Sequence, residues 1–109
     1  MENKRTVILA DANEEFRSML RARVGQSEEY TVAGETGDGT EALELIEQRE
    51  PDLAVIDLVL PGTDGVSLLR QLREEGLKTR VIVLSAFCAD QVVAEAMGLG
   101  AGLFPAQAV

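Results

Sequence analysis

The chain has 109 residues, 46% of them hydrophobic, which is enough to bury one core, so we expect a single domain. Its net charge is −9 with no histidine, a balance that repels nucleic acid and suits cations or basic protein surfaces. Neither a signal peptide nor an apolar run long enough to span a membrane is visible, and the single cysteine excludes an internal disulfide, so we expect a cytoplasmic protein.

The chain begins with a pattern typical of a strand followed by a helix. Residues 6–10 form a continuous apolar run, which is typical of a strand buried on both faces, and this run ends on Asp11. Apolar residues then recur at helical spacing between charged ones, so we expect an amphipathic helix over residues 13–24, capped by Asn13. The first predicted strand therefore delivers a carboxylate to the turn before the first helix.

A weaker strand and a second helix are predicted next. Residues 30–35 are less apolar than the first strand, as an edge position in a sheet allows. Asp38 and Glu41 have the spacing of a capping box just before an apolar helical pattern, and Pro51 cannot continue that helix. We therefore expect a helix that begins after Asp38 and ends before Pro51.

The segment 53–65, with the sequence LAVIDLVLPGTDG, is the stretch around which the other predicted elements are arranged. Its short apolar run ends on Asp57, and an acid at the end of a buried strand is costly unless it emerges at a site. Pro61 and Gly62 then force a turn, and Asp64 can accept the first free backbone donors of a third helix. The sequence therefore presents Asp57 at the carboxyl edge of a sheet, although an Asp that merely opens a loop would show the same local pattern.

The remaining chain predicts two more strands and a weak helix. Residues 81–84 form the third strongly apolar strand, which ends on Ser85. A fourth helix is expected over residues 91–97, where apolar residues recur before two breaking glycines. Residues 103–104 begin a last strand, and Pro105 cannot donate to a ladder, which indicates an edge position.

Strands and helices thus alternate along the whole chain, which predicts an α/β fold with a parallel sheet covered by helices on both faces. In such sheets ligands bind beyond the carboxyl ends of the strands, where the strand order reverses. Asp11, Asp57 and Ser85 all follow predicted strand ends. Two carboxylates and a hydroxyl that converge there could hold a hard cation and offer one carboxylate to a phosphoryl group as a nucleophile.

Five pieces of the sequence resemble the response-regulator receiver domains of two-component signalling. In chain order they are VILAD, GETGDGTEALELI, PDLAVIDLVLPGTDG, VIVLSAF and LGAGLF. The resemblance extends from Val7 to about Gln107 and is strongest to receivers that precede helix-turn-helix DNA-binding domains. It implies a doubly wound, five-stranded parallel sheet in the order 2-1-3-4-5, a Mg²⁺ cofactor, and phosphorylation by a sensor histidine kinase.

The resemblance also implies roles for individual residues. Asp57 corresponds to the phosphoacceptor, Val59 would offer its backbone carbonyl to Mg²⁺, and Asp11 corresponds to the first of the family's paired acids. Ser85 corresponds to the switch hydroxyl and Phe104 to the switch aromatic. A strand-ending serine and an apolar edge-strand phenylalanine would also suit purely structural roles at these two positions.

Two positions depart from the receiver pattern. Ala12 stands where the family has a second acid, so the metal would lose a carboxylate ligand. Gln107 stands where the family has a lysine, so the fixed positive charge that holds a phosphoryl oxygen is absent. Phosphoryl transfer depends on neutralising the charge of the equatorial oxygens, and both changes weaken that step. We therefore expect weak or absent Mg²⁺ binding at Asp11, Asp57 and Val59, and a degraded phosphorylation site.

The function expected from these features is that of a protein-interaction module in signal transduction or transcription regulation, not an enzyme. A working receiver, phosphorylated on Asp57 with reduced efficiency, is the alternative. A haloacid-dehalogenase-type phosphatase also has an Asp after its first strand, but it needs a second acid where this chain has Asn13. A flavodoxin-like cofactor carrier would need a Gly-rich phosphate loop after the first strand, which is lacking. Cys88 is expected to pack as a small hydrophobe.

The predicted domain covers residues 1–109 and stops early for a receiver. Receivers normally finish with a fifth helix that shares one sheet face with the first helix, and we expect that helix to be missing here. Part of the apolar stripe of the first helix would then lie uncovered. The stripe consists of Phe16, Met19, Leu20 and Val24. Self-association, or an output domain in a longer chain, is the expected cover, with no direct contact to nucleic acid or membrane.

Overall fold

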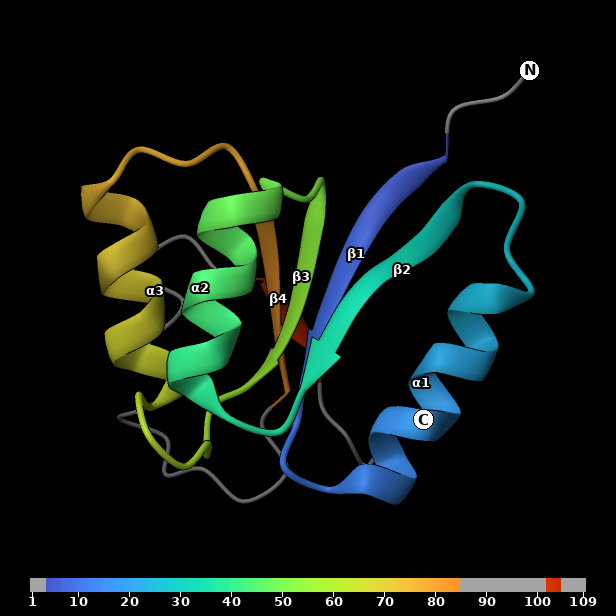
Figure 1. Cartoon of the computed structure of the whole chain (residues 1–109), viewed down its shortest axis with the longest axis horizontal. Coiled ribbons are helices and arrows are strands. Elements are labelled where there is room, and N and C mark those ends of the chain that lie inside the picture. The colour runs from blue at the N-terminus through green and yellow to red at the C-terminus, as the bar shows by residue number, and fades with distance from the viewer. Residues whose placement is uncertain (1–3, 85–101, 105–109) are drawn as a thin grey trace.

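The computed structural model of the chain describes residues 4–84 and the backbone of residues 102–104. Its elements are β1 Arg5–Ala10, α1 Glu14–Gly25, β2 Tyr30–Thr36, α2 Gly39–Arg49, β3 Leu53–Asp57, α3 Gly65–Glu74, β4 Arg80–Leu84 and β5 Gly102–Phe104. The strands form one parallel sheet in the order β2-β1-β3-β4-β5 (Figure 1). The predicted α/β class and strand order are confirmed. The predicted helix over residues 91–97, Cys88 and the chain after Phe104 lie outside the described residues.

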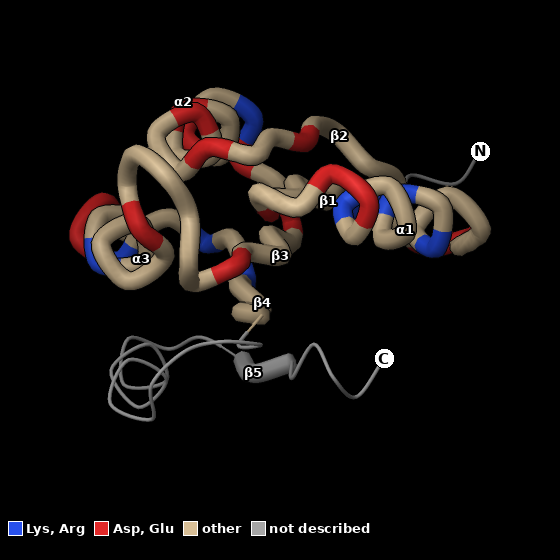
Figure 2. Tube along the Cα trace, turned by 90° about the horizontal axis from the view of Figure 1, so that it is seen from below, with Lys and Arg blue, Asp and Glu red and all other residues tan. Residues whose placement is uncertain are grey.

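Helices lie on both faces of the sheet. α2 and α3 lie next to each other on one face, and α1 lies on the other face beside β1 and β2 (Figure 2). The main core fills the space between the sheet and the α2–α3 pair. Its buried members from the sheet and the two helices include Ile8, Ala10, Ala54, Ile56, Ala42, Ile46, Leu68 and Leu72. β1 is therefore buried on both faces, which explains its continuous apolar run, whereas β3 is fully buried only at Ala54 and Ile56, on the side of α2 and α3.

Each of the three described helices begins at a side chain that accepts a backbone N–H from the first turn. The N-caps are Asn13, Asp38 and Asp64, and their acceptor oxygens lie 3.0, 2.9 and 2.9 Å from the nitrogens of the residues three positions on. These bonds satisfy donors that a helix leaves unpaired, so the predicted caps are confirmed. The N–H of Ser67 also holds the pKa of Asp64 below its usual value.

The helix α1 is attached differently from α2 and α3, because none of its residues is fully buried. Met19 is 37% exposed, while Phe16, Leu20 and Val24 are half-buried. Ion pairs from Arg17 and Arg21 to Glu35 of β2 add to the attachment of α1. No helix in the described part of the chain is long and apolar enough to cross a membrane.

Candidate functional site

Two carboxylates lie side by side at the edge where the strands end. β1 and β3 pair directly, with Ala10 opposite Ile56, so Asp11 and Asp57 each occupy the next position along neighbouring strands. The sheet order reverses at these strands, since β1 leads to β2 on one side and β3 leads to β4 on the other. Asp11 is only 5% exposed, and Asp57 is half-buried. The strand-end acids predicted from the sequence therefore converge at the carboxyl edge of the sheet.

Local backbone donors hold both carboxylates in place. The N–H of Asn13 donates to Oδ1 of Asp11 at 2.8 Å, and the N–H of Val59 donates to Oδ1 of Asp57 at 3.0 Å. Burial raises the pKa of Asp11, against the lowering effects of the Asn13 N–H and the Arg17 charge. Burial also raises the pKa of Asp57, where the Val59 N–H opposes the rise and the charge of Asp11 adds to it. The charge of Asp11 thus disfavours ionisation of Asp57, and a cation between the two carboxylates would relieve that repulsion.

The edge of the sheet offers a small number of oxygen donors to a divalent cation. Asp11 and Asp57 supply two carboxylates, and Val59, which is 58% exposed, could add a backbone carbonyl. Ala12 contributes no side-chain oxygen to the turn between them. Within residues 4–84, no three His, Cys, Asp or Glu side chains gather closely enough to hold a metal ion. Any Mg²⁺ held at this edge would take its remaining oxygen ligands from water or from a phosphoryl group.

The loop after β3 is docked against the start of α2, a contact that the sequence analysis missed. The N–H of Gly39 donates to the carbonyl oxygen of Pro61 at 2.9 Å, and the hydroxyls of Thr40 and Thr63 lie 3.1 Å apart. Gly62 has φ of 76°, in the left-handed region that favours glycine. Gly62 in the predicted turn after Pro61 was the only local signal for this contact. The docking fixes the segment that follows Asp57.

A cluster of two arginines around one glutamate was also missed. Arg17 Nε lies 2.9 Å from Oε1 of Glu35, and Arg21 Nη1 donates to Oε2 of the same side chain. A second nitrogen of Arg17, Nη1, donates to the backbone oxygen of Asp11 at 2.6 Å. The hydrogen bonds from Arg21 and Arg17 hold the pKa of Glu35 below its usual value. The i, i+4 spacing of the arginines could have indicated a shared helix face, but not the partner on β2.

The predicted site residues fall into two groups. The structure brings together Asp11, Ala12, Asp57 and Val59. Phe104 is the last residue of β5 and pairs with Leu84 of β4, so its backbone reaches the same edge of the sheet. Ser85 and Gln107 lie outside the described residues, and their roles stay predictions.

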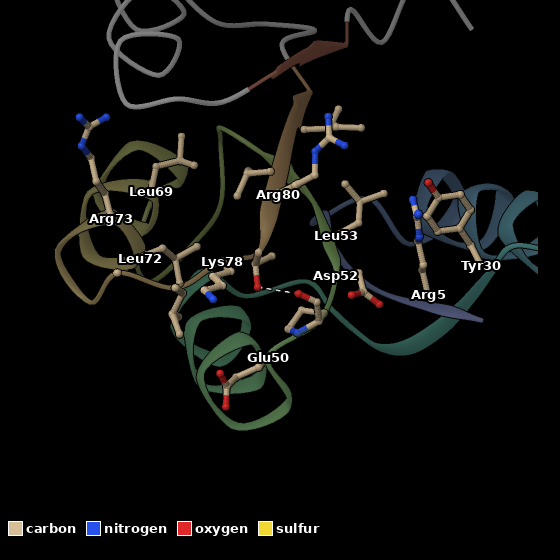
Figure 3. A pocket seen from close by; sticks show the side chains of 16 residues that line it. Arg5, Tyr30, Glu50, Asp52, Leu53, Leu69, Leu72, Arg73, Lys78 and Arg80 are labelled. Atoms are coloured by element: carbon tan, nitrogen blue, oxygen red, sulfur yellow. Dashed lines mark hydrogen bonds between the residues drawn. The ribbon is translucent and has the colours of Figure 1, made fainter. Parts of the chain in front are cut away.

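A large cavity of about 1330 Å³ lies at the opposite edge of the sheet, near the amino ends of the strands (Figure 3). Side chains from β1, β3, β4 and α3 line it, and Thr79 Oγ1 donates to the Pro51 carbonyl within this lining at 2.7 Å. Leu53 and Leu72 give the cavity apolar walls, while Arg80 adds positive charge. The cavity is remote from the two carboxylates and forms no part of the site.

Comparison with known proteins gives one consistent result. The family model described as the response regulator receiver domain matches residues 7–104. The nitrate/nitrite response regulator protein NarL of Escherichia coli K12 is 33% identical over 96 residues, which are 88% of this chain and 44% of NarL. The chain therefore spans less than half the length of that curated relative.

Solved structures agree with the family match. The receiver domain of the putative response regulator NarL from Mycobacterium tuberculosis is 35% identical, with a TM-score of 0.88 over 94% of this chain and 83% of that one. A LuxR-family two-component response regulator from Aurantimonas sp. SI85-9A1 is 26% identical, with a TM-score of 0.82 over 93% of this chain and 73% of that one. Both are similar to this chain over nearly its whole length.

Proposed function

Because the chain belongs to the response regulator receiver domain family, we propose that it is a receiver with a degraded phosphorylation site that acts as a protein-interaction module. The observation that carries the proposal is Ala12. It lies in the turn after Asp11, beside Asp57, at the position where a third acid would complete the donor set. No other acid within the described residues takes the place of that carboxylate.

Asp57 is the proposed phosphoacceptor. Its half-buried carboxyl group has a raised pKa, because burial and the charge of Asp11 both oppose ionisation. The ionised form is the nucleophile, so a site that neutralises little charge slows attack on a phosphoryl donor. Ala12 and Gln107 together remove two groups that would supply this neutralisation. These features support slow or absent phosphorylation.

Mass spectrometry of the intact protein after exposure to acetyl phosphate with Mg²⁺ tests this proposal. We expect little or no addition of a phosphoryl group to the natural sequence. Rapid stoichiometric labelling that disappears in Asp57→Asn would instead establish a working receiver. A mock incubation without acetyl phosphate controls for other adducts.

Mg²⁺ should show no appreciable binding to the natural chain at millimolar concentration. Loss of even an outer-shell partner typically lowers metal affinity by about 10- to 100-fold, and replacement of a direct ligand by Ala12 should cost at least that much. Isothermal titration calorimetry measures the affinity, and Ala12→Asp should recover it. Adding Asp11→Asn to that variant should abolish the recovered binding. Tight binding by the unaltered chain would contradict this prediction.

The proposed partners are a sensor histidine kinase or another signalling protein, and an output domain in a longer chain. The relatives that match this chain are response regulators, and the E. coli relative is more than twice as long as the matched segment. The net charge of −9 favours basic protein surfaces over nucleic acid as direct partners. These features support a role in signal transduction or transcription regulation rather than in enzymatic turnover.

Self-association at micromolar concentration is a further part of the proposal. The helix α1 has no fully buried residue, and Met19 and its half-buried neighbours offer an apolar stripe for a second copy. Light scattering should show a dimer, and Met19→Glu should shift the equilibrium toward the monomer. A strict monomer with a cooperative melt typical of a complete domain would contradict the expectation.

A further inference from the structure

The guanidinium of Arg17 contacts the turn after Asp11, which the sequence did not predict. Nη1 of Arg17 donates to the backbone oxygen of Asp11 at 2.6 Å. The same nitrogen lies close to Ala12, because a Cβ added to Gly37 would lie 3.1 Å from Nη1 of Arg17 and 3.6 Å from Cα of Ala12. The guanidinium group therefore lies next to the turn in which a carboxylate is missing.

Arg17 is fixed in this position by a second anchor on a different strand. Its Nε lies 2.9 Å from Oε1 of Glu35, and Glu35 is the register partner of Leu9 on β1. The planar guanidinium thus bridges the end of β1 and the neighbouring strand β2. The Arg17 side chain is 16% exposed, so solvent screens its charge less than that of a surface arginine.

Arg21 provides an internal comparison for Arg17. It lies one helical turn further along α1 and donates to the other carboxylate oxygen of Glu35. Its side chain is 52% exposed, and it contacts Glu35 rather than the Asp11 turn. An effect on Mg²⁺ affinity that comes only from pairing with Glu35 should be shared by both arginines. An effect that comes from the contact with the Asp11 turn should belong to Arg17 alone.

We propose that Arg17 is the resident cation of this site, a positioning residue that holds the Asp11 turn and disfavours the binding of a divalent cation. The inference rests on the proposed degraded receiver and adds a second cause for its low metal affinity. Ala12 removes an oxygen ligand, while Arg17 places a fixed positive charge close to where the ion would bind. Both act against Mg²⁺, one by removing attraction and the other by adding repulsion.

The test is calorimetric titration with Mg²⁺ in the Ala12→Asp background, where binding is expected to be measurable. Adding Arg17→Gln should tighten binding by at least about tenfold, because it removes a poorly screened charge next to the ion. Adding Arg21→Gln, which also removes one charge and one partner of Glu35, should leave the affinity within about twofold. Arg17→Lys keeps the charge and should bind Mg²⁺ no more tightly than the Ala12→Asp parent.

A purely structural role of Arg17 predicts the opposite sign, because a loosened Asp11 turn would weaken metal binding. Unchanged or weaker binding after Arg17→Gln would therefore overturn the proposal. Arg17→Met, which keeps an unbranched aliphatic stem, is the second neutral variant should Arg17→Gln fail to fold. If Mg²⁺ binding is not measurable in Ala12→Asp, with or without Arg17→Gln, the test moves to Arg17→Met in the otherwise natural chain. There, Mg²⁺ should shift the amide resonances of Asn13 and Val59 more than it does in the natural sequence. A response no stronger than in the natural sequence would overturn the proposal.

The test of Arg17 and the test of the proposed function can fail independently of each other. Mg²⁺ affinity is measured without a phosphoryl donor, so rapid labelling of Asp57 by acetyl phosphate would overturn the degraded-receiver proposal on its own. Tighter binding in Arg17→Gln would then still identify the resident cation. Slow labelling combined with unchanged Mg²⁺ affinity would retain the proposed function and remove Arg17 from its explanation.

Discussion

Gly39→Ala should destabilise the domain severely. A Cβ at this position would lie 1.6 Å from the carbonyl oxygen of Thr63 and 2.6 Å from its carbonyl carbon. Both atoms belong to the main chain, so either the loop after β3 or the start of α2 would have to move. Overpacking typically costs about 1–3 kcal/mol, and a contact this short belongs at the upper end, so we expect the free energy of unfolding to fall by about 3 kcal/mol or more. Chemical denaturation followed by circular dichroism measures the change.

The matched control is Gly25→Ala at the end of α1. A Cβ at Gly25 meets nothing within 4 Å. Alanine is favoured over glycine inside a helix by about 0.5–1 kcal/mol, so this variant should be as stable as the natural chain or slightly more so. Equal stability of the Gly39→Ala and Gly25→Ala variants would show that the loop after β3 is not rigidly docked on α2.

The regular elements of the first 84 residues could be predicted because their signals are local. The apolar runs that end on Asp11 and Asp57 indicated strands buried on both faces, and both became central strands. The caps at Asn13, Asp38 and Asp64 were visible as acids or amides before an apolar helical pattern, and each accepts the expected N–H. Alternation of these elements was then sufficient to predict the parallel sheet and its carboxyl edge.

The contacts that shape the candidate site could not be predicted in the same way, since they join residues far apart in the sequence. From the sequence, Glu35 was only a charged residue near the end of a predicted edge strand, although it forms ion pairs with Arg17 and Arg21 of α1. Gly39 was expected only as the start of a helix, although the main chain at Thr63 leaves no room for a side chain there. Neither contact follows from periodicity or propensity, because both depend on how two elements are packed together.

Ala12 could be singled out only by comparison with a family pattern. Its departure from the receiver pattern came from resemblance, and the structure then showed what surrounds it: two carboxylates with raised pKa values and the guanidinium of Arg17. An alanine in a turn carries no chemical signal of its own. In the function proposed for this chain, missing charge neutralisation is the feature that sets the site apart.

Ala12→Asp combined with Gln107→Lys should raise the rate at which Asp57 takes up a phosphoryl group by more than either change alone. The carboxylate introduced at position 12 would add a metal ligand beside Asp57, and the new lysine would supply a fixed positive charge for a phosphoryl oxygen. Loss of one group that stabilises developing charge typically lowers a rate by about 10²–10³-fold, so restoring one should be worth up to about 100-fold. Because both changes act on one transition state, their effects should be coupled.

A time course of phosphoryl incorporation from acetyl phosphate with Mg²⁺, followed by intact-protein mass spectrometry, measures this gain in the two single variants and the double variant. The same double variant with Asp57→Asn should remain unlabelled, which assigns the modification to that carboxylate. A double variant no faster than Ala12→Asp would show that position 107 does not serve the phosphoryl site. Because Asp57 is already held at the edge beside Asp11, with Val59 donating to its carboxylate, such a gain requires no rearrangement of the strands. Charge neutralisation, rather than the placement of the nucleophile, is then what limits the natural chain.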